Sequence, residues 1–375
     1  MQYASLGRHP DVQVSRLGLG GHREGVEVLD GIARTATFFL PAEGRAAVVG
    51  AAIDSGVTYF DSTFGCELAS MGESFRILGV RDGLFVNGMR VDFFANLLAD
   101  ELDARAYTRR EVEGRLRDFG FDQIDQFLLG ALDSGDPLSG ELDLMRAALD
   151  ELLTMKAEGK LRFVGFSCHD PDYAARLIEA FPDAFDTVMT PYNFINRTAE
   201  GKLADVLMTT NTAWVAMKPL VWRAYGLPVT VLRNLRPVPG RLELDPEVPI
   251  GELAIRSILA NPLITSTVPA MSTVQAVAEN LRAIDGELTG SDMAHLAAYA
   301  SVMDAEDLVP LAIGGLLEDN LRVRACGLGT IARALGLTLP AIDYAEPDAE
   351  AQAAAVAGQV INDLRNDPEW DTIIP

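Results

Sequence analysis

The residues best suited to chemistry follow two short apolar runs in the first quarter of the chain. Asp61 comes directly after the run "GVTYF", and Cys66 and Glu67 follow it within six residues. Arg90 comes directly after the next such run, "LFVNGM". A carboxylate and a guanidinium at the ends of neighbouring strands can form a bidentate ion pair, and the guanidinium can also bind an anionic substrate. We therefore predict that Arg90 pairs with Asp61, and that Cys66 and Glu67 are further candidates for acid–base catalysis.

Two further polar clusters also follow apolar runs. His22 and Glu24 lie in "GLGGHREGVE", and His169 lies in "RFVGFSCHD". A histidine beside a carboxylate can supply both an acid and a base near neutral pH. The simpler alternatives stay open here: a solvated loop for "GGHREGVE", and a structural ion pair for Asp61 and Arg90.

The elements that would position these residues alternate between short strands and amphipathic helices. An open doubly wound sheet is the competing architecture, but the chain has no GxGxxG turn after a strand. Eight strand–helix units over roughly 250 residues are typical of a (β/α)8 TIM barrel, whose active site lies at the carboxyl ends of the strands. The expected strands are Arg16–Gly20, Val57–Phe60, Leu84–Asn87, Gln126–Leu129, Phe163–Phe166, Thr187–Thr190, Ala213–Met217 and Thr265–Val268.

The pattern changes after about Glu287, where helical periodicity continues without strands between the helices. We therefore predict an α/β fold with two parts: a (β/α)8 barrel over residues 1–287, and a C-terminal helical extension over residues 288–375.

Composition excludes several classes of function. The formal net charge of −23 opposes binding to nucleic acid or to an anionic membrane surface. The three cysteines lie far apart and form no CxxC pair, so we expect neither a metal nor a disulfide framework. We find no signal peptide and no membrane span, and reduced thiols fit a cytoplasmic protein.

Six segments, in order, resemble successive motifs of the aldo-keto reductases over residues 1 to about 285. They are "GVTYFDST", "YTRREVEGRLRDFGFDQIDQFLL", "LDELLTMKAEGKLRFVGFSCHD", "PYNFINR", "VAMKPL" and "TSTVPAMSTVQAVAENLRA". The resemblance implies a (β/α)8 barrel, NADP(H) and carbonyl reduction of a small molecule. It is nearest to the branch with "MKPL" and a helical tail that often carries an iron–sulfur cluster. Since Cys326 is the only cysteine of this tail, no cluster is expected.

The family's catalytic Asp, Tyr, Lys and His are only partly matched. Asp61 matches the Asp, but the Tyr position offers only Phe64 and Cys66, the Lys position holds Arg90, and the His position holds Gly130. Arginine does not give up its proton at ordinary pH, and glycine removes a hydrogen-bond donor and is expected to open space. Loss of a tuned general acid typically costs about 10²–10⁴ in rate, so ordinary ketone reduction should be poor.

The cofactor side of the family pattern is better kept. The resemblance implies that Tyr192 stacks on the nicotinamide and that the loop opened by Lys218 covers the pyrophosphate. The expected contacts with NADP(H) or NAD(H) are Ser167, Tyr192, Asn193, Lys218, Pro219, Leu220, Ser272, Thr273, Glu279 and Asn280.

The two cofactors are not distinguished by the adenine end of that site. Ala270, Met271 and Ala276 stand where many family members place Lys, Ser and Arg on the 2′-phosphate. Anion binding would therefore depend on Ser272, Thr273 and the amino end of the helix that follows them.

Three functions are consistent with this sequence. The first is an oxidoreductase with a relocated proton donor, the candidates being His22, Cys66, Glu67 and His169. The second is a lyase, isomerase or dehydratase acting on an anionic small molecule held by Arg90, with Asp61, Glu24 or His22 as the base. The third is a non-catalytic partner protein that works through its barrel and helical tail. The substrate and the oligomeric state do not follow from the sequence.

Overall fold

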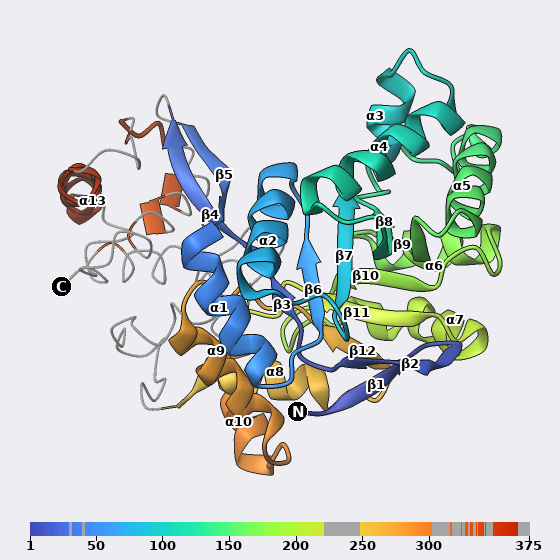
Figure 1. Ribbon diagram of the computed structural model, residues 1–375. Helices are drawn as coiled ribbons and strands as arrows, with labels where there is room; N and C mark the ends of the chain where they lie inside the picture. The colour runs from blue at the N-terminus through green and yellow to red at the C-terminus, as the bar shows by residue number, and fades with distance from the viewer. Residues whose placement is uncertain are drawn as a thin grey trace. The chain divides into compact units, whose positions relative to one another are not determined.

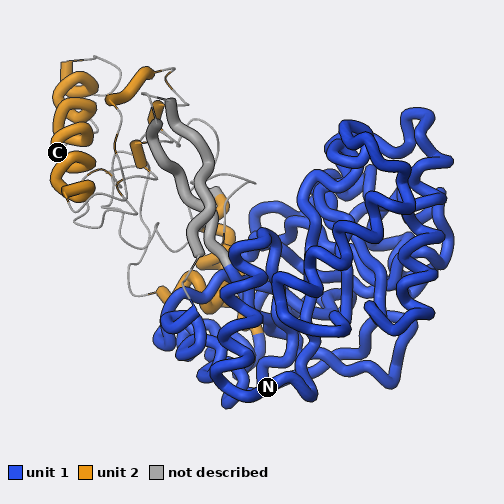
Figure 2. Tube along the Cα trace, turned by 45° about the horizontal axis from the view of Figure 1, so that its top comes forward, with its two compact units in different colours: residues 1–23, 39–219, 255–287 blue, residues 24–38, 220–254, 288–375 orange. Residues whose placement is uncertain are grey.

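The computed structural model describes residues 1–29, 32–39, 42–220, 248–301 and 348–366, together with short pieces between 316 and 342 (Figure 1). Of residues 22–29 and 32–39 only the backbone is described. The chain divides into two compact units (Figure 2). Unit 1 holds residues 1–23, 39–219 and 255–287, and unit 2 holds residues 24–38, 220–254 and 288–375. One change of unit therefore falls after Glu287, but the division of the chain into two domains there stays a prediction.

Eight parallel strands form the barrel, and their edges meet. Backbone bridges join Leu17 to Thr267 and Gly20 to Ala270, and the N–H of Gly18 donates to the carbonyl of Thr267 at 2.8 Å. All eight predicted strands are present, so the (β/α)8 prediction is confirmed. In spatial order they are β12 (Ile264–Thr267), β11 (Ala213–Met217), β10 (Thr187–Pro191), β9 (Leu161–Ser167), β8 (Ile124–Leu129), β7 (Phe85–Arg90), β6 (Tyr59–Ser62) and β3 (Leu19–Gly20).

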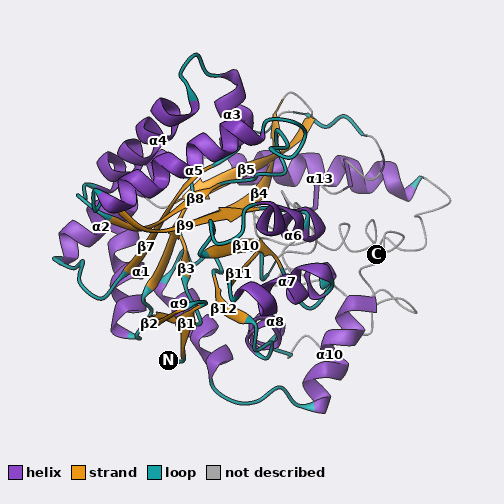
Figure 3. Cartoon of the chain, turned by 90° about the vertical axis from the view of Figure 1, so that its right-hand side faces the viewer, coloured by secondary structure: helices purple, strands orange, loops and turns teal. Residues whose placement is uncertain are grey.

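Helices lie outside these strands (Figure 3). Around the barrel they are α1 (Ala42–Asp54), α2 (Gly65–Leu78), α3 (Phe93–Ala99), α4 (Ala104–Phe119), α5 (Leu142–Ala157), α6 (Pro171–Ala180), α7 (Lys202–Thr210), α8 (Ile250–Leu259) and α9 (Val274–Leu281), with the 3₁₀ turns η1 (Thr198–Glu200) and η3 (Arg282–Ile284). The predicted helical extension is confirmed in α10 (Gly290–Ser301) and α13 (Ala349–Arg365). The apolar face of α13 packs in a cluster of its own with Leu316, Leu328 and Ile331.

Two pairs of strands were not expected. β1 (Tyr3–Leu6) and β2 (His9–Ser15) form an antiparallel hairpin, and β4 (His22–Leu29) pairs with β5 (Ile32–Phe39). The prediction of a loop at "GGHREGVE" is therefore wrong. The segment "HREGVEVL" forms β4, which contains His22 and Glu24; of its residues only Val26, Glu27 and Val28 alternate with the period of a strand.

Alternation along the strands builds the barrel interior. Tyr59, Phe85, Met89, Leu128 and Phe163 are buried and pack in one cluster, which Leu6 and Val14 of the β1–β2 hairpin also join. Successive side chains of a strand point to opposite faces, so the residues between these face the helix layer. This rule decides which of the predicted site residues can meet.

Helices α2 and α4 approach closely at Gly72, which is buried. A Cβ atom at Gly72 would lie 2.2 Å from the carbonyl oxygen of Phe119 and 2.7 Å from its Cα. Backbone atoms cannot move aside as a flexible side chain can, so only glycine fits this crossing.

We predict that Gly72→Ala lowers the free energy of unfolding by about 1–3 kcal/mol, because the helices must separate. The matched control is Gly114→Ala within α4, where the nearest atom to a new Cβ is the exposed Arg117 guanidinium at 3.8 Å. That variant should gain about 0.5–1 kcal/mol from helix propensity. Equal stability changes for both variants in chemical denaturation would contradict the close crossing.

Candidate active site at the barrel mouth

Asp61 lies on β6, near the carboxyl end of the strand, and is 5% exposed. Its neighbour in the parallel register is Asn87 of β7. The amide Nδ2 of the fully buried Asn87 donates a hydrogen bond to Asp61 Oδ1. A buried carboxylate requires such donors, because leaving water without them is costly. The Asn87 amide therefore supplies a hydrogen bond to the Asp61 carboxylate, which we had expected Arg90 to bind.

Arg90 does not pair with Asp61, so that prediction is wrong. Its Nε lies 2.9 Å from Glu111 Oε2 on α4, although the angle is poor for a hydrogen bond, and it also contacts the Tyr107 hydroxyl. The reason is the alternation of β7: Asn87 faces the interior, so Arg90, three positions on, faces the helix layer. A shift of one residue reverses the side to which a strand residue points.

Met89 is the inward-facing residue nearest the end of β7, and it fills the room that Gly130 was expected to open. A Cβ atom at Gly130 would lie 2.7 Å from Met89 Cγ and 2.7 Å from the Arg90 carbonyl oxygen. The Met89 thioether also lies 3.8 Å from the Ser167 hydroxyl. A side chain at position 130 would therefore collide with Met89, which already fills this space. The prediction of open space at Gly130 is wrong.

Glu67 is fully buried and serves the start of α2. Its Oε2 accepts the N–H groups of Thr63 at 3.1 Å and Phe64 at 3.4 Å, which makes it the acidic residue of a capping box. Its other oxygen lies against Gly21, where a Cβ atom would come within 2.0 Å of it. Cys66, beside it, is an exposed free thiol in the first turn of α2.

Tyr59 is a phenol near Asp61 that the sequence analysis did not single out. It lies two residues before Asp61 on the same strand, and its ring stacks on Phe85 with centroids 5.1 Å apart. Burial, and then the charge of Asp61, raise the pKa of this phenol well above its ordinary value. A phenol held neutral in this way is a poor proton donor.

His169 and Asp133 meet beyond the carboxyl ends of β9 and β8. His169 Nδ1 lies 3.2 Å from Asp133 Oδ2, and the His169 backbone N–H donates to Asp133 Oδ1 at 3.1 Å. Both side chains are about 30% exposed. Burial alone would raise the pKa of Asp133, but the bonds from His169 outweigh it and hold that pKa below its ordinary value. Sequence reasoning missed Asp133; its only signal was an acidic residue four positions after a buried strand.

Cys168, between Ser167 and His169, is fully buried. Burial and the nearby carboxylate of Asp133 raise the pKa of its thiol to about 12. The thiol donates to the carbonyl oxygen of Asp170 at 3.1 Å. Cys168 is therefore not a nucleophile at neutral pH.

The expected cofactor residues at the end of β9 and directly after β10, Ser167 and Tyr192, already have structural partners. The Ser167 hydroxyl accepts the N–H of Ala131 at 2.9 Å. Tyr192 is 3% exposed; its ring packs on Trp214 at 4.9 Å and its hydroxyl donates to Glu200 at 2.5 Å. Stacking on a nicotinamide stays a prediction, and it requires the Tyr192 ring to become exposed.

Asn193 stabilises the turn after β10. Its side-chain oxygen accepts the N–H groups of Ile195 and Asn196, and its Nδ2 donates to the carbonyl of Lys218 at 3.0 Å. Lys218 follows β11 in the left-handed region, with φ 57°, and Pro219 and Leu220 turn the chain after it.

The expected phosphate residues, Ser272 and Thr273, lie at the amino end of α9, and Glu279 and Asn280, expected at the adenine end of the cofactor site, lie in its last turn. Thr273 caps that helix by accepting the N–H of Ala276 at 3.0 Å, and Ser272 precedes it. Glu279 accepts from Gln275 at 2.8 Å, and Asn280 is 9% exposed. The first N–H groups of a helix have no acceptor within it and suit a phosphate.

The family of the chain follows from its match to a family model. The model described as the aldo/keto reductase family matches residues 35–222, half of the chain. The chain belongs to the aldo/keto reductase family.

Solved structures of other aldo-keto reductases share this fold. The holo form of one from Bacillus halodurans is 19% identical, with a TM-score of 0.58, over 80% of this chain and 96% of that chain. A thermostable one in complex with the inhibitor epalrestat is 20% identical, with a TM-score of 0.58, over 80% and 100%. One from Klebsiella pneumoniae in complex with NADP and acetate is 21% identical, with a TM-score of 0.54, over 76% and 91%. At these identities the likeness concerns the fold alone.

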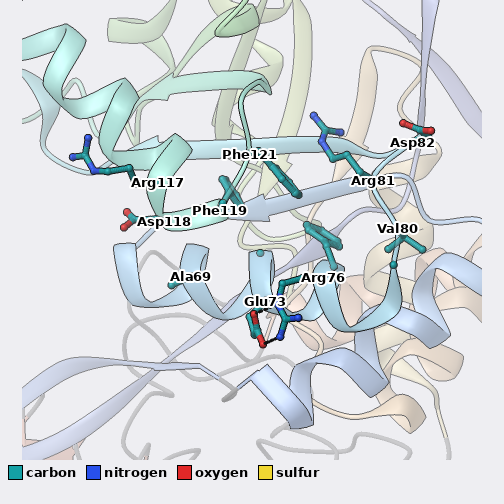
Figure 4. A pocket seen from close by; sticks show the side chains of 14 residues that line it. Ala69, Glu73, Arg76, Val80, Arg81, Asp82, Arg117, Asp118, Phe119 and Phe121 are labelled. Carbon is teal, nitrogen blue, oxygen red and sulfur yellow. Dashed lines mark hydrogen bonds and ion pairs between the residues drawn. The ribbon is translucent and has the colours of Figure 1, made fainter.

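A separate pocket of about 780 Å³ lies away from the mouth of this aldo/keto reductase (Figure 4). It is formed where α2 and α4 end, before β7 and β8 begin, and so belongs to the amino ends of the strands. Phe119 and Phe121 point into it, and Arg76 is bonded to Glu73 at its edge. Its lining does not include the predicted site residues.

The described residues contain neither a candidate metal site nor a helix that could cross a membrane. Among these residues no three His, Cys, Asp or Glu side chains converge in a way that could hold a metal ion. None of the described helices is both long and apolar enough to cross a membrane. Cys326 lies outside the described residues.

We predict that Asn87→Leu lowers the free energy of unfolding by about 1.5–3 kcal/mol, because the buried Asp61 carboxylate loses a donor. The matched variants are Asp61→Leu and the double variant. The double variant should be more stable than the sum of the single losses implies, since removing both partners leaves no unpaired group. Losses that add within about 0.5 kcal/mol in urea denaturation would show that the bond does not form.

Proposed function

We propose that the chain is a nicotinamide-dependent oxidoreductase that binds NADP(H) or NAD(H) and reduces a small carbonyl compound with a non-standard proton donor. The observation that carries this proposal is the buried, inward-facing Asp61 at the end of β6, in the barrel of an aldo/keto reductase. At the positions that the resemblance gives to Tyr, Lys and His, the chain holds Phe64 or Cys66, Arg90 and Gly130, and none of these is a tuned acid. Arg90 faces the helix layer, so Met89 is the inward-facing residue nearest the end of β7.

The phosphate end of the cofactor fits the residues present. Ser272, the capping Thr273 and the amino end of α9 would hold phosphate oxygens, and Lys218 would approach from the end of β11. One related structure contains NADP and another contains NADPH, which supports the same cofactor class here. When bound, the reduced nicotinamide supplies the hydride. The ring end fits less well, because Tyr192 is buried against Trp214.

The candidate proton donors can be narrowed by their contacts. Glu67 is occupied by the capping of α2, and Cys66 is an exposed thiol on a helix. The side chains of His22 and Glu24 lie outside the described residues. His169 already has an orienting carboxylate, and it lies at the active-site end of the barrel.

Of the two other functions, the non-redox enzyme loses support, and the non-catalytic partner protein predicts a different result for cofactor binding. A lyase, isomerase or dehydratase depended on Arg90 as an anion clamp, and Arg90 instead contacts Glu111. The expectation of an anionic substrate loses its basis with it. A non-catalytic partner protein predicts folding without cofactor binding.

We predict that NADPH or NADH changes the intrinsic tryptophan fluorescence, with saturation at micromolar to low millimolar concentration. Trp214 packs on Tyr192, so its emission should respond when that side of the barrel is occupied. The comparison variant is Thr273→Val, which removes the side-chain cap of α9. It should weaken cofactor binding several-fold. No change with either cofactor at millimolar concentration would contradict the proposed function.

A further inference from the structure

We infer that Asp133 and His169 form the acid–base pair of this site, with His169 Nε2 as the proton donor and Asp133 as the residue that positions it. This inference rests on the proposed function. It adds a carboxylate and a defined nitrogen atom to a role that the sequence left open among four residues.

The Asp133 carboxylate holds the His169 imidazole in one orientation. One oxygen of Asp133 accepts the His169 backbone N–H and the other faces ring Nδ1, so the carboxylate fixes both the loop and the ring. A proton on Nδ1 then leaves Nε2 as the working atom. Among the described residues nothing bonds to Nε2, and the ring is 29% exposed.

The two loops that carry the pair are joined at the mouth. The N–H of Ala131 donates to the Ser167 hydroxyl at 2.9 Å, and the N–H of Leu132 donates to the Ser167 carbonyl at 3.0 Å. Ser167 itself contacts Met89, the inward-facing residue two positions after Asn87 on β7. Ser167 therefore holds the loop that carries Asp133, and it also contacts the inward-facing Met89 of β7.

The chain has a second His–Asp pair, His9 and Asp186, whose contacts are those of a structural ion pair. His9 Nε2 lies 2.7 Å from Asp186, but Asp186 also contacts Arg8 and Lys156 and accepts the N–H of Val164. It precedes β10, at the amino ends of the strands. Asp133 has no cation other than His169 within reach among the described residues.

Among the described residues, the titratable groups next to His169 in the chain are the Cys168 thiol and Asp170. Asp170 caps α6 by accepting the N–H groups of Asp172 and Tyr173. Further out, the Tyr173 hydroxyl donates to Asp136. The Cys168 thiol stays protonated at neutral pH, so it does not compete as an acid.

The step balances without any further reactant. Hydride from the reduced nicotinamide forms the new C–H bond as the carbonyl π electrons move to oxygen. The proton on His169 Nε2 passes to that oxygen, which leaves an alcohol, an oxidised nicotinamide and a neutral imidazole still bonded to Asp133 through Nδ1. Solvent then returns the proton to Nε2.

The first test needs no turnover. With four histidines in the chain, ¹⁵N imidazole spectra are simple to assign using His169→Asn and His9→Asn. In the neutral form His169 should carry its proton on Nδ1, and Asp133→Asn should abolish that preference. A wild-type His169 that carries its proton on Nε2 would overturn the inference.

The second test separates proton transfer from cofactor binding. His169→Asn should lower kcat about 10²–10⁴-fold with a carbonyl panel, while the fluorescence Kd for NADPH changes less than about twofold. Asp133→Asn should move the basic limb of the pH–rate profile to lower pH, and Asp133→Glu should restore part of it. His9→Asn is the matched control and should leave both unchanged.

The outcomes of the second test point to different failures. Absent cofactor binding in the wild type would sink the proposed function. Binding with wild-type turnover that His169→Asn leaves unaltered would overturn the role of the Asp133–His169 pair alone. Binding without turnover of any carbonyl would overturn both the pair and the proposed carbonyl reduction.

Discussion

The alternation of side chains along β7 is the constraint on which the site depends. It places Asn87 and Met89 inside the barrel and Arg90 outside it, against Glu111. The parallel register then sets Asn87 beside Asp61, so that a neutral amide meets the buried carboxylate. No rotamer of Arg90 alters this, because the backbone decides the side to which each residue of a strand points.

The unusual residues at the mouth depend on one another. Met89 occupies the volume beside Gly130, where any larger residue would collide with it, and it contacts Ser167. Ser167 in turn joins the loops that present Asp133 and His169. In the proposed function, the proton donor is therefore His169 at the rim of the site and not a residue on its floor. A bulky thioether and a neutral amide below would leave that floor less polar.

Much of the fold was predictable because the spacing of apolar residues along the chain distinguishes strands from helices. Several of the eight runs, such as Ala213–Met217, are short and predominantly apolar, and parallel strands buried on both faces produce that pattern. The β4–β5 pair was missed because "HREGVEVL" contains as many polar residues as apolar ones and follows a glycine-rich turn. Propensity alone does not decide such a segment.

The site was less predictable for physical reasons. The position of a strand end is uncertain by a residue or two, and an error of one residue moved Arg90 from the helix layer into the barrel. Asp133 lies in a loop held by the bond from Ala131 to Ser167, and its partner His169 is 36 residues away, so local sequence could not reveal that partner. The burial of Tyr192 against Trp214 likewise depends on packing between separate strands.

The most direct measurement is a crystal structure of the chain with NADP⁺ bound, in which the side chains of β7 are located. We predict that it will show the Asn87 amide bonded to the Asp61 carboxylate, Met89 beside Gly130, and Arg90 against Glu111 on α4. A guanidinium of Arg90 inside the barrel and bonded to Asp61 would contradict it.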